Sequence, residues 1–103
     1  MSEYKIDLEN RLNINQNRQL EINETLKIIP KGHINILYRN NKGYYYLTYR
    51  NGKKINNDYL GPVGKADLSD IMSSLTKRDH LKKELKYLKE EEKHLKKQIR
   101  KAK

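Results

Sequence analysis

The fold is decided by the stretch YYYLTYRNGKKINNDYLG, residues 44–61, in which two strand-like runs flank an Asn-Gly dipeptide. Asn-Gly favours a type I′ turn, because that turn needs positive φ at both of its central residues. The stretch therefore predicts a β-hairpin whose loop is Asn51-Gly52. This loop places Arg50 opposite Lys53, Thr48 opposite Ile55, Tyr46 opposite Asn57 and Tyr44 opposite Tyr59.

Side chains alternate between the two faces of a strand, so the hairpin has two chemically different sides. One side holds Tyr45, Leu47 and Tyr49, and the other holds Tyr44, Tyr46, Thr48 and Arg50. The first can be buried while the second presents tyrosine hydroxyls beside cations. We predict that the hairpin is both the nucleus of the fold and a binding surface.

A third strand is predicted over residues 33–39, HINILYR, which alternates well and ends in the turn-forming sequence Asn-Asn-Lys-Gly. A loop centred on Asn41-Lys42 puts Ile34, Ile36 and Tyr38 on the side of Leu47, which becomes the core side. A one-residue change in the turn would exchange the two faces of the sheet, because the face of each side chain and the register of the strands are coupled.

Helices are predicted on both sides of the sheet in the sequence. Residues 18–28 favour a helix that is ended by Pro30 and Gly32, and residues before it form a loose helix, a strand or a flexible arm. After residues 61–64, Asp67 or Ser69 begins a helix whose apolar stripe covers the sheet. The stripe consists of Leu68, Ile71, Met72 and Leu75.

From residue 77 onward the sequence predicts a long charged helix, free of Gly and Pro, with leucines at heptad spacing. In a parallel pair, Glu84 and Glu91 would each meet a lysine of the partner, which favours a two-stranded coiled coil. The alternative is a helix folded back on its own N-terminal helix, or one left partly solvated. The predicted dimer interface consists of Leu81, Leu85, Leu88, Leu95 and Ile99.

Together these elements predict an α+β fold: a three-stranded antiparallel sheet backed by a helix, with a long charged C-terminal helix. Three segments are expected. Residues 1–30 form a helical or flexible segment, residues 31–76 form the sheet with its covering helix, and residues 77–103 form the charged helix.

The composition favours a polyanionic partner. The 103 residues have a formal net charge of +10, and residues 31–65 hold seven basic side chains against one acid, Asp58. The chain has no cysteine, no apolar run long enough to span a bilayer and no secretory leader, so we expect no membrane contact and a cytoplasmic location in a bacterial host cell.

No pattern in the sequence indicates catalysis or a cofactor. His80 and Glu84, and Glu90 and His94, have helical i,i+4 spacing that could hold a metal, but such pairs usually form a solvated face. Residues 61–65 lack the spacing of a phosphate-binding loop. We therefore expect a protein that is not an enzyme and binds no metal.

The basic, Tyr-rich sheet is the candidate site. Arg and Lys neutralise phosphates, Arg and Asn hydrogen-bond base edges, and exposed Tyr stacks on unpaired bases. The alternative is that the tyrosines belong to the core and the lysines only solubilise an edge. The residues predicted to bind nucleic acid are Lys31, Arg39, Lys42, Tyr44, Tyr46, Arg50, Lys53, Lys54 and Asn57.

The pattern Tyr-Tyr-Tyr-Leu-x-Tyr-Arg-x-Gly-Lys, followed by Tyr-Leu-Gly and a charged coil, resembles a family of small phage and bacterial proteins. It is also similar to the hairpin at the start of some transposases and tyrosine integrases, where a three-stranded sheet backed by a helix contacts DNA. The resemblance covers roughly residues 30–100, without the catalytic parts of a transposase. It implies DNA association in a mobile-element setting.

Three functions follow from these observations. The first is a DNA- or RNA-binding accessory protein of a phage or mobile element. The second is a phage-encoded inhibitor of a host defence nuclease, of the anti-CRISPR or anti-restriction type, that binds the nuclease complex or its guide RNA. The third is an assembly protein that acts through its coiled coil.

Overall fold

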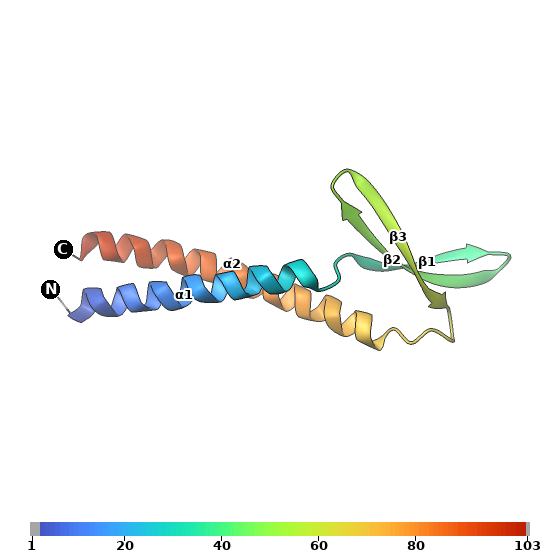
Figure 1. Ribbon diagram of the computed structural model, residues 1–103, viewed down its shortest axis with the longest axis horizontal. Coiled ribbons are helices and arrows are strands. Elements are labelled where there is room, and N and C mark those ends of the chain that lie inside the picture. The colour runs from blue at the N-terminus through green and yellow to red at the C-terminus, as the bar shows by residue number, and fades with distance from the viewer. Residues whose placement is uncertain (1–2, 103) are drawn as a thin grey trace. The chain divides into compact units, whose positions relative to one another are not determined.

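The computed structural model describes residues 3–102 and has an α+β fold (Figure 1). Along the chain, its elements are α1 (Glu3–Ile28), β1 (His33–Arg39), β2 (Lys42–Asn51), β3 (Lys54–Pro62) and α2 (Ser69–Lys101). The strands form one antiparallel sheet in the order β1-β2-β3. This confirms the predicted three-stranded sheet and the long C-terminal helix.

The chain divides into two compact units, and the boundary falls inside α2. The sheet unit comprises residues 29–78, close to the predicted segment 31–76. The helical unit combines α1 with α2 from Asp79 onward, so the two predicted terminal segments belong to one unit.

Both turns of the sheet differ by one residue from the predicted positions. The first loop is Asn40-Asn41, where φ is 51° and 65°, so the type I′ turn forms here. The second loop is Gly52-Lys53, because Asn51 pairs with Lys54. Only Gly52 has positive φ in this loop, as a type II′ turn requires.

The predicted faces survive, so the expectation that a one-residue change in the turn exchanges them was wrong. Each displaced turn moves the strand pairing by two residues, which leaves the alternation unchanged. Ile34 pairs with Leu47 and Ile36 with Tyr45, as residues of one face do. Leu47 is 6% exposed and is the buried apolar side chain of the described sheet. A bulge between Tyr45 and Tyr46 leaves Leu60 as the extra residue of β3.

The first helix, α1, is much longer than the predicted helix over residues 18–28, since it begins at Glu3. It ends at Ile28, two residues before Pro30, as expected from the missing amide and fixed φ of proline. Gly32 then has a φ of +110°, a conformation that favours glycine. The region before Arg18, for which three structures were considered, is helical from Glu3.

The second helix, α2, joins the predicted sheet-covering helix and the predicted charged helix into one continuous element. Asp67 caps it by accepting hydrogen bonds from the backbone amide and hydroxyl of Ser69, which lower the pKa of its carboxyl. Of the predicted covering stripe, Leu68, Ile71 and Leu75 are half-buried, while Met72 is 55% exposed.

The helical unit is an antiparallel pair. Arg18 of α1 contacts Glu84 of α2, whereas Asn15, earlier in α1, contacts Leu88 and Glu91, which come later in α2. The core of this unit is built from a few apolar side chains and one amide. They are Leu8, Ile22, Leu88, Leu95 and Asn15. In the described residues, no helix is long and apolar enough to cross a membrane.

Candidate nucleic-acid interface

One side of the sheet gathers three tyrosines from β2 and β3. The ring centroids of Tyr46 and Tyr59 are 5.4 Å apart, and those of Tyr44 and Tyr59 are 6.2 Å apart, both pairs tilted. Tyr59 is 57% exposed, and the other two rings are half-buried. We call this side the tyrosine face; its polar members besides the rings are His33, Asn35, Arg39, Lys42, Thr48, Arg50 and Asn57.

A hydrogen-bonded row of side chains crosses the tyrosine face. Asn35 donates from Nδ2 to the Thr48 hydroxyl over 2.7 Å, and that hydroxyl donates to Oδ1 of Asn57 over 2.6 Å. This row fixes the direction of both amides. Oδ1 of Asn35 and Nδ2 of Asn57 are then left to accept from and donate to a ligand.

Among the described residues, no ion pair joins Arg39, Lys42 or Arg50 of the tyrosine face to a carboxylate. Arg39 and Lys42 are direct cross-strand partners next to the first turn, and like charges in that arrangement destabilise a sheet. Arg50 lies toward the other turn, opposite Ile55. A bound anion would relieve the repulsion between Arg39 and Lys42.

The acid of the sheet is on the other side. Asp58 pairs with Leu47 on the face opposite the tyrosine cluster, where its carboxylate accepts a hydrogen bond from Tyr49. That bond raises the pKa of the Tyr49 hydroxyl. Asp58 is therefore committed to an internal contact and does not neutralise the tyrosine face.

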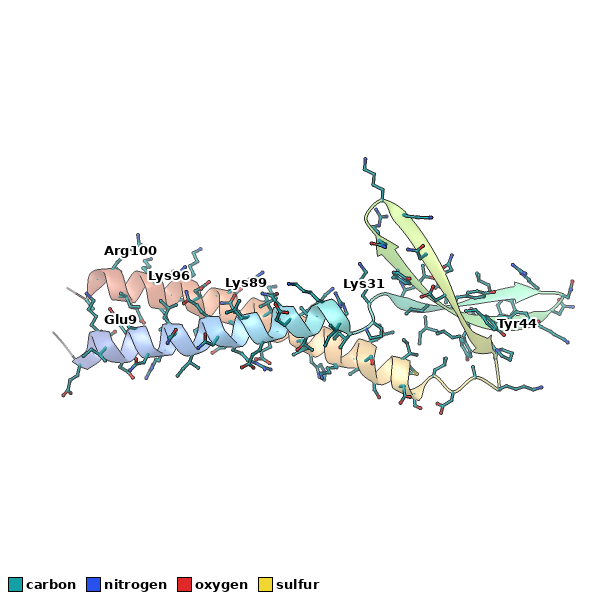
Figure 2. The ribbon with its side chains drawn as sticks, in the orientation of Figure 1. Glu9, Lys31, Tyr44, Lys89, Lys96 and Arg100 are labelled. Carbon is teal, nitrogen blue, oxygen red and sulfur yellow. The ribbon has the colours of Figure 1, made fainter. Side chains whose placement is uncertain are left out.

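The structure brings together six of the nine residues predicted to bind nucleic acid. Those on the tyrosine face are Arg39, Lys42, Tyr44, Tyr46, Arg50 and Asn57. Lys53 is in the turn, Lys31 lies between α1 and β1, and Lys54 starts β3 on the opposite face, across from Asn51. Figure 2 labels Lys31 and Tyr44 among the side chains.

Four polar or aromatic residues of this face were missing from the predicted set: His33, Asn35, Thr48 and Tyr59. Tyr59 follows Asn57 by two residues, so strand alternation alone places both on one side. The row from Asn35 to Asn57 depends on the register, which the predicted turns displaced. With Asn51-Gly52 as the loop, Thr48 would have faced Ile55.

The predicted dimer interface of α2 is already used within one chain. Leu88 and Leu95 are 9% and 6% exposed in the helical unit, while Leu81, Leu85 and Ile99 are half-buried. Glu84 and Glu91, expected to meet lysines of a partner helix, instead bind Arg18 and Asn15. A homodimer through these leucines would require them to leave α1.

In the polar contacts between the helices, α1 supplies the donors and α2 supplies the carboxylates. Arg18 binds Glu84 with two guanidinium nitrogens, at 2.6 and 2.9 Å, and this contact lowers the pKa of the Glu84 carboxyl and raises that of Arg18. Gln16 donates to Glu92 and lowers the pKa of that carboxyl too. Three acids of α2, Glu84, Glu91 and Glu92, are thus turned toward α1.

The described residues contain no cluster of three or more His, Cys, Asp or Glu that could hold a metal ion. His94 and Glu90 do line a common pocket, but Lys93 and Lys97 line it as well. Two ammonium groups beside the pair would oppose binding of a cation.

A protein-family model described as a domain of unknown function, DUF6788, matches residues 6–70. The match includes most of α1, the whole sheet and the start of α2. No curated protein and no solved structure matches the chain.

Proposed function

We propose that this chain, which belongs to the DUF6788 family, is a non-enzymatic protein that binds nucleic acid through the tyrosine face of its sheet. The observation that supports this most directly is the cluster of Tyr44, Tyr46 and Tyr59 on the same face as Arg39, Lys42 and Arg50, with the acid of the sheet on the other face.

The ring cluster favours a ligand with unpaired bases. Bases inside a duplex are already stacked, whereas an exposed tyrosine offers an unpaired base a new stacking partner worth roughly 1–3 kcal/mol. Tyr59 is the most exposed ring of the three, with Tyr46 directly across from it. We therefore propose that the preferred ligand is a single strand or an unpaired region.

The fixed amides supply hydrogen bonds beside the rings. Nδ2 of Asn57 can donate to a base carbonyl or ring nitrogen, and Oδ1 of Asn35 can accept from an exocyclic amine. The cations at the two turns would then hold the backbone on either side of the stacked bases. In the setting implied by the resemblance to mobile-element proteins, the ligand is DNA or RNA of a phage or mobile element in a bacterial cytoplasm.

The test is fluorescence anisotropy of labelled oligo(dT) and of a labelled DNA duplex, with the full chain, over a series of salt concentrations. Tyr46→Thr combined with Tyr59→Thr keeps strand-favouring residues and removes two rings. We expect the affinity for oligo(dT) to fall by at least about tenfold. The matched control is Tyr38→Thr, because Tyr38 is 73% exposed but lies on the opposite face.

The cations are tested separately. Arg50→Ala combined with Lys53→Ala should lower the slope of log affinity against log salt by about 1 to 2 units. Equal losses from the Tyr38 control and the two-ring variant, or a double cation variant that binds as the wild type at every salt concentration, would contradict the proposal.

A further inference from the structure

One side of α2 consists entirely of cations over five turns. Successive helical residues are rotated by about 100°, so positions within an arc of about 100° share one side. Between residues 82 and 100, every position in one such arc is Lys or Arg. We call this row the basic stripe: Lys82, Lys86, Lys89, Lys93, Lys96, Lys97 and Arg100, all exposed. Lys89, Lys96 and Arg100 are labelled in Figure 2.

The stripe is not neutralised by the acids of its own helix. Glu84, Glu91 and Glu92 each accept a hydrogen bond from α1, and of these three acids Glu92 also reaches a lysine of the stripe. Within the described residues, the ion pair that involves the stripe joins Nζ of Lys96 to Oε2 of Glu92, and its length of 3.8 Å is long for an ion pair. Glu90 lies at its border, beside Lys93 and Lys97.

Ordinary helix electrostatics does not explain this row. The helix dipole favours cations only in the last turn of a helix, whereas the stripe begins about five turns earlier, at Lys82. A helix side that is merely solvated mixes both signs so that i,i+4 pairs can form. Seven like charges on one side repel one another, and a polyanion would relieve that repulsion.

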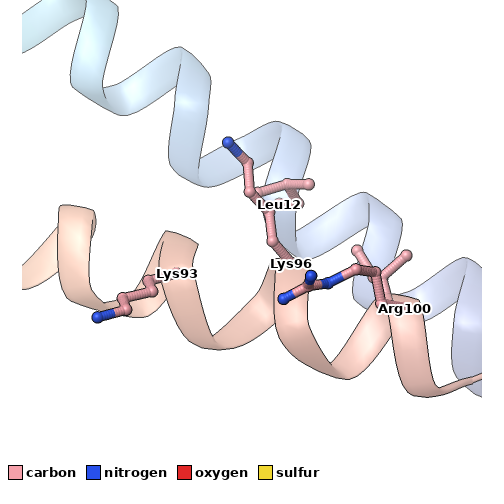
Figure 3. Close-up of a pocket in the computed structure, with 5 residues that line it drawn as sticks. Leu12, Lys93, Lys96 and Arg100 are labelled. Atoms are coloured by element: carbon pink, nitrogen blue, oxygen red, sulfur yellow. The ribbon is translucent and has the colours of Figure 1, made fainter.

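Three cations of the stripe line one pocket. Lys93, Lys96 and Arg100 line a pocket of about 450 Å³ together with Leu12 and Ile99 (Figure 3). Leu12 comes from α1 and the others come from α2. Basic side chains from two successive turns of α2 therefore border this pocket.

The dimensions and composition of the stripe favour a nucleic-acid backbone over a lipid surface. The stripe spans roughly 27 Å at 1.5 Å per residue, a length over which a nucleic-acid strand presents several phosphates. An interfacial membrane helix needs an exposed apolar side to enter the bilayer. Here the leucines of the same segment face α1, and the stripe itself contains no apolar residue.

We propose that the basic stripe is a second binding surface, which takes the phosphate backbone of a nucleic acid without reading its sequence. It shares no residue with the tyrosine face and lies in the other unit. Nucleic-acid binding by the stripe can therefore be tested independently of binding by the tyrosine face. Because it contacts phosphates and not bases, the stripe should bind duplex and single strand alike.

The test uses the full chain with three lysines changed, Lys89→Gln, Lys93→Gln and Lys96→Gln, since Gln keeps the helix propensity of Lys. The control removes the same number of charges elsewhere: Lys27→Gln, Lys65→Gln and Lys83→Gln. The probe is a labelled DNA duplex, titrated from about 50 to 200 mM NaCl. Circular dichroism checks that both variants stay helical.

We expect the stripe variant to lower the salt slope by about 2 to 3 units and to weaken duplex binding at low salt by at least about tenfold, with little change in the control. Equal effects of the two variants would mean that only the net charge of the chain matters and not the position of the lysines, which would overturn the proposal. So would loss of binding to vesicles of anionic phospholipid with duplex binding unchanged. If the stripe variant binds the duplex normally while the two-ring variant of the sheet loses affinity for oligo(dT), the stripe proposal is refuted and the sheet proposal stands. If the two-ring variant binds oligo(dT) normally while the stripe variant loses affinity for the duplex, the sheet proposal alone is refuted.

Discussion

The helical unit and the sheet unit differ in how much they bury. In the helical unit, Leu8, Ile22, Leu88 and Leu95 are buried together with the amide of Asn15. In the sheet unit, Leu47 is the apolar side chain that reaches similar burial, while Ile36 and the rings of Tyr38 and Tyr59 stay exposed. The helical unit therefore buries more apolar side chains than the sheet does, although Ile14, Leu20 and Ile28 of α1 stay exposed. The sheet leaves much of its aromatic surface open to a ligand.

The difference also extends to polar groups. Asn15 is 2% exposed, yet it is satisfied on three sides, by the carbonyl of Leu88, by Glu91 and by Gln19. On the tyrosine face, the polar row from Asn35 to Asn57 is only partly buried and keeps hydrogen-bonding capacity at both ends. In the helical unit, the buried polar side chain holds the register of the two helices. In the sheet unit, the polar side chains remain available for a ligand.

The largest effect is expected from the core of the helical unit. Ile22 is 1% exposed, and Ile22→Ala should lower the free energy of unfolding by about 3 kcal/mol, through lost burial and the cavity left behind. Urea unfolding followed by helical circular dichroism measures this loss. Leu20→Ala is the control, since Leu20 is 63% exposed, and it should cost less than about 0.5 kcal/mol. Equal losses would mean that α1 does not face α2 as described.

The next effect separates two glycines of the sheet unit. At Gly32, φ is +110° and a Cβ would overlap the carbonyl oxygen of Thr48, so Gly32→Ala should cost about 2 kcal/mol or more. At Gly52, φ is +66° and the space is open, so Gly52→Ala should cost about 1 kcal/mol from backbone strain alone. Thermal unfolding of the two variants compares them. A Gly52 variant as damaged as the Gly32 variant would place the second turn elsewhere.

A smaller effect is expected at the buried amide. Asn15→Ala removes hydrogen bonds to the Leu88 carbonyl and to Glu91 and should cost about 1 to 2 kcal/mol. Asn15→Leu tests specificity, because a buried polar residue often fixes the register of paired helices. We expect this variant to be stable but to form dimers in sedimentation, as helices freed from one register pair between chains. If it remains monomeric with an unchanged helix contact, Asn15 does not set the register.

The smallest effect is a pH dependence of the helical unit. Arg18 holds the pKa of the Glu84 carboxyl below its ordinary value of 4.5, so the contact stabilises the fold above that pH. The stabilisation should be lost as the pH falls below 4.5 through the lowered pKa. Because the Glu84 side chain is 39% exposed, the change should be slight. Glu84→Gln should flatten the acid side of a plot of melting temperature against pH, whereas Glu90→Gln should not.

Sequence predicted the sheet well because period-two alternation and turn residues are local signals. It missed the turn positions by one residue, since Asn51-Gly52 is a strong turn signal but cross-strand contacts decided the register. With Gly52-Lys53 as the loop, Tyr46 meets Tyr59 and Thr48 meets Asn57, and both pairs interact through their side chains. The preference of an isolated dipeptide contains none of that information.

The extent of α1 could not be predicted because its apolar residues lie on both sides of the helix. Leu8 and Ile22 are buried, while Ile14, Leu20 and Ile28 are exposed, so no single stripe marks the segment. Its many asparagines also argued against a helix, yet one of them, Asn15, is at the centre of the contact with α2. For α2, heptad spacing identified the buried side correctly and left open whether the partner was a second chain or α1.

The central claim, that the tyrosine face binds nucleic acid, is tested most directly by NMR of the full chain titrated with oligo(dT). Stacked bases shift the resonances of the rings they cover. We expect the ring signals of Tyr44, Tyr46 and Tyr59 to shift upfield together and to saturate with the binding curve. The ring signals of Tyr4, exposed on α1, and Tyr38, exposed on the opposite face of the sheet, should stay in place. If oligo(dT) saturates the protein while the ring resonances of Tyr44, Tyr46 and Tyr59 do not shift, the tyrosine face is not the binding site.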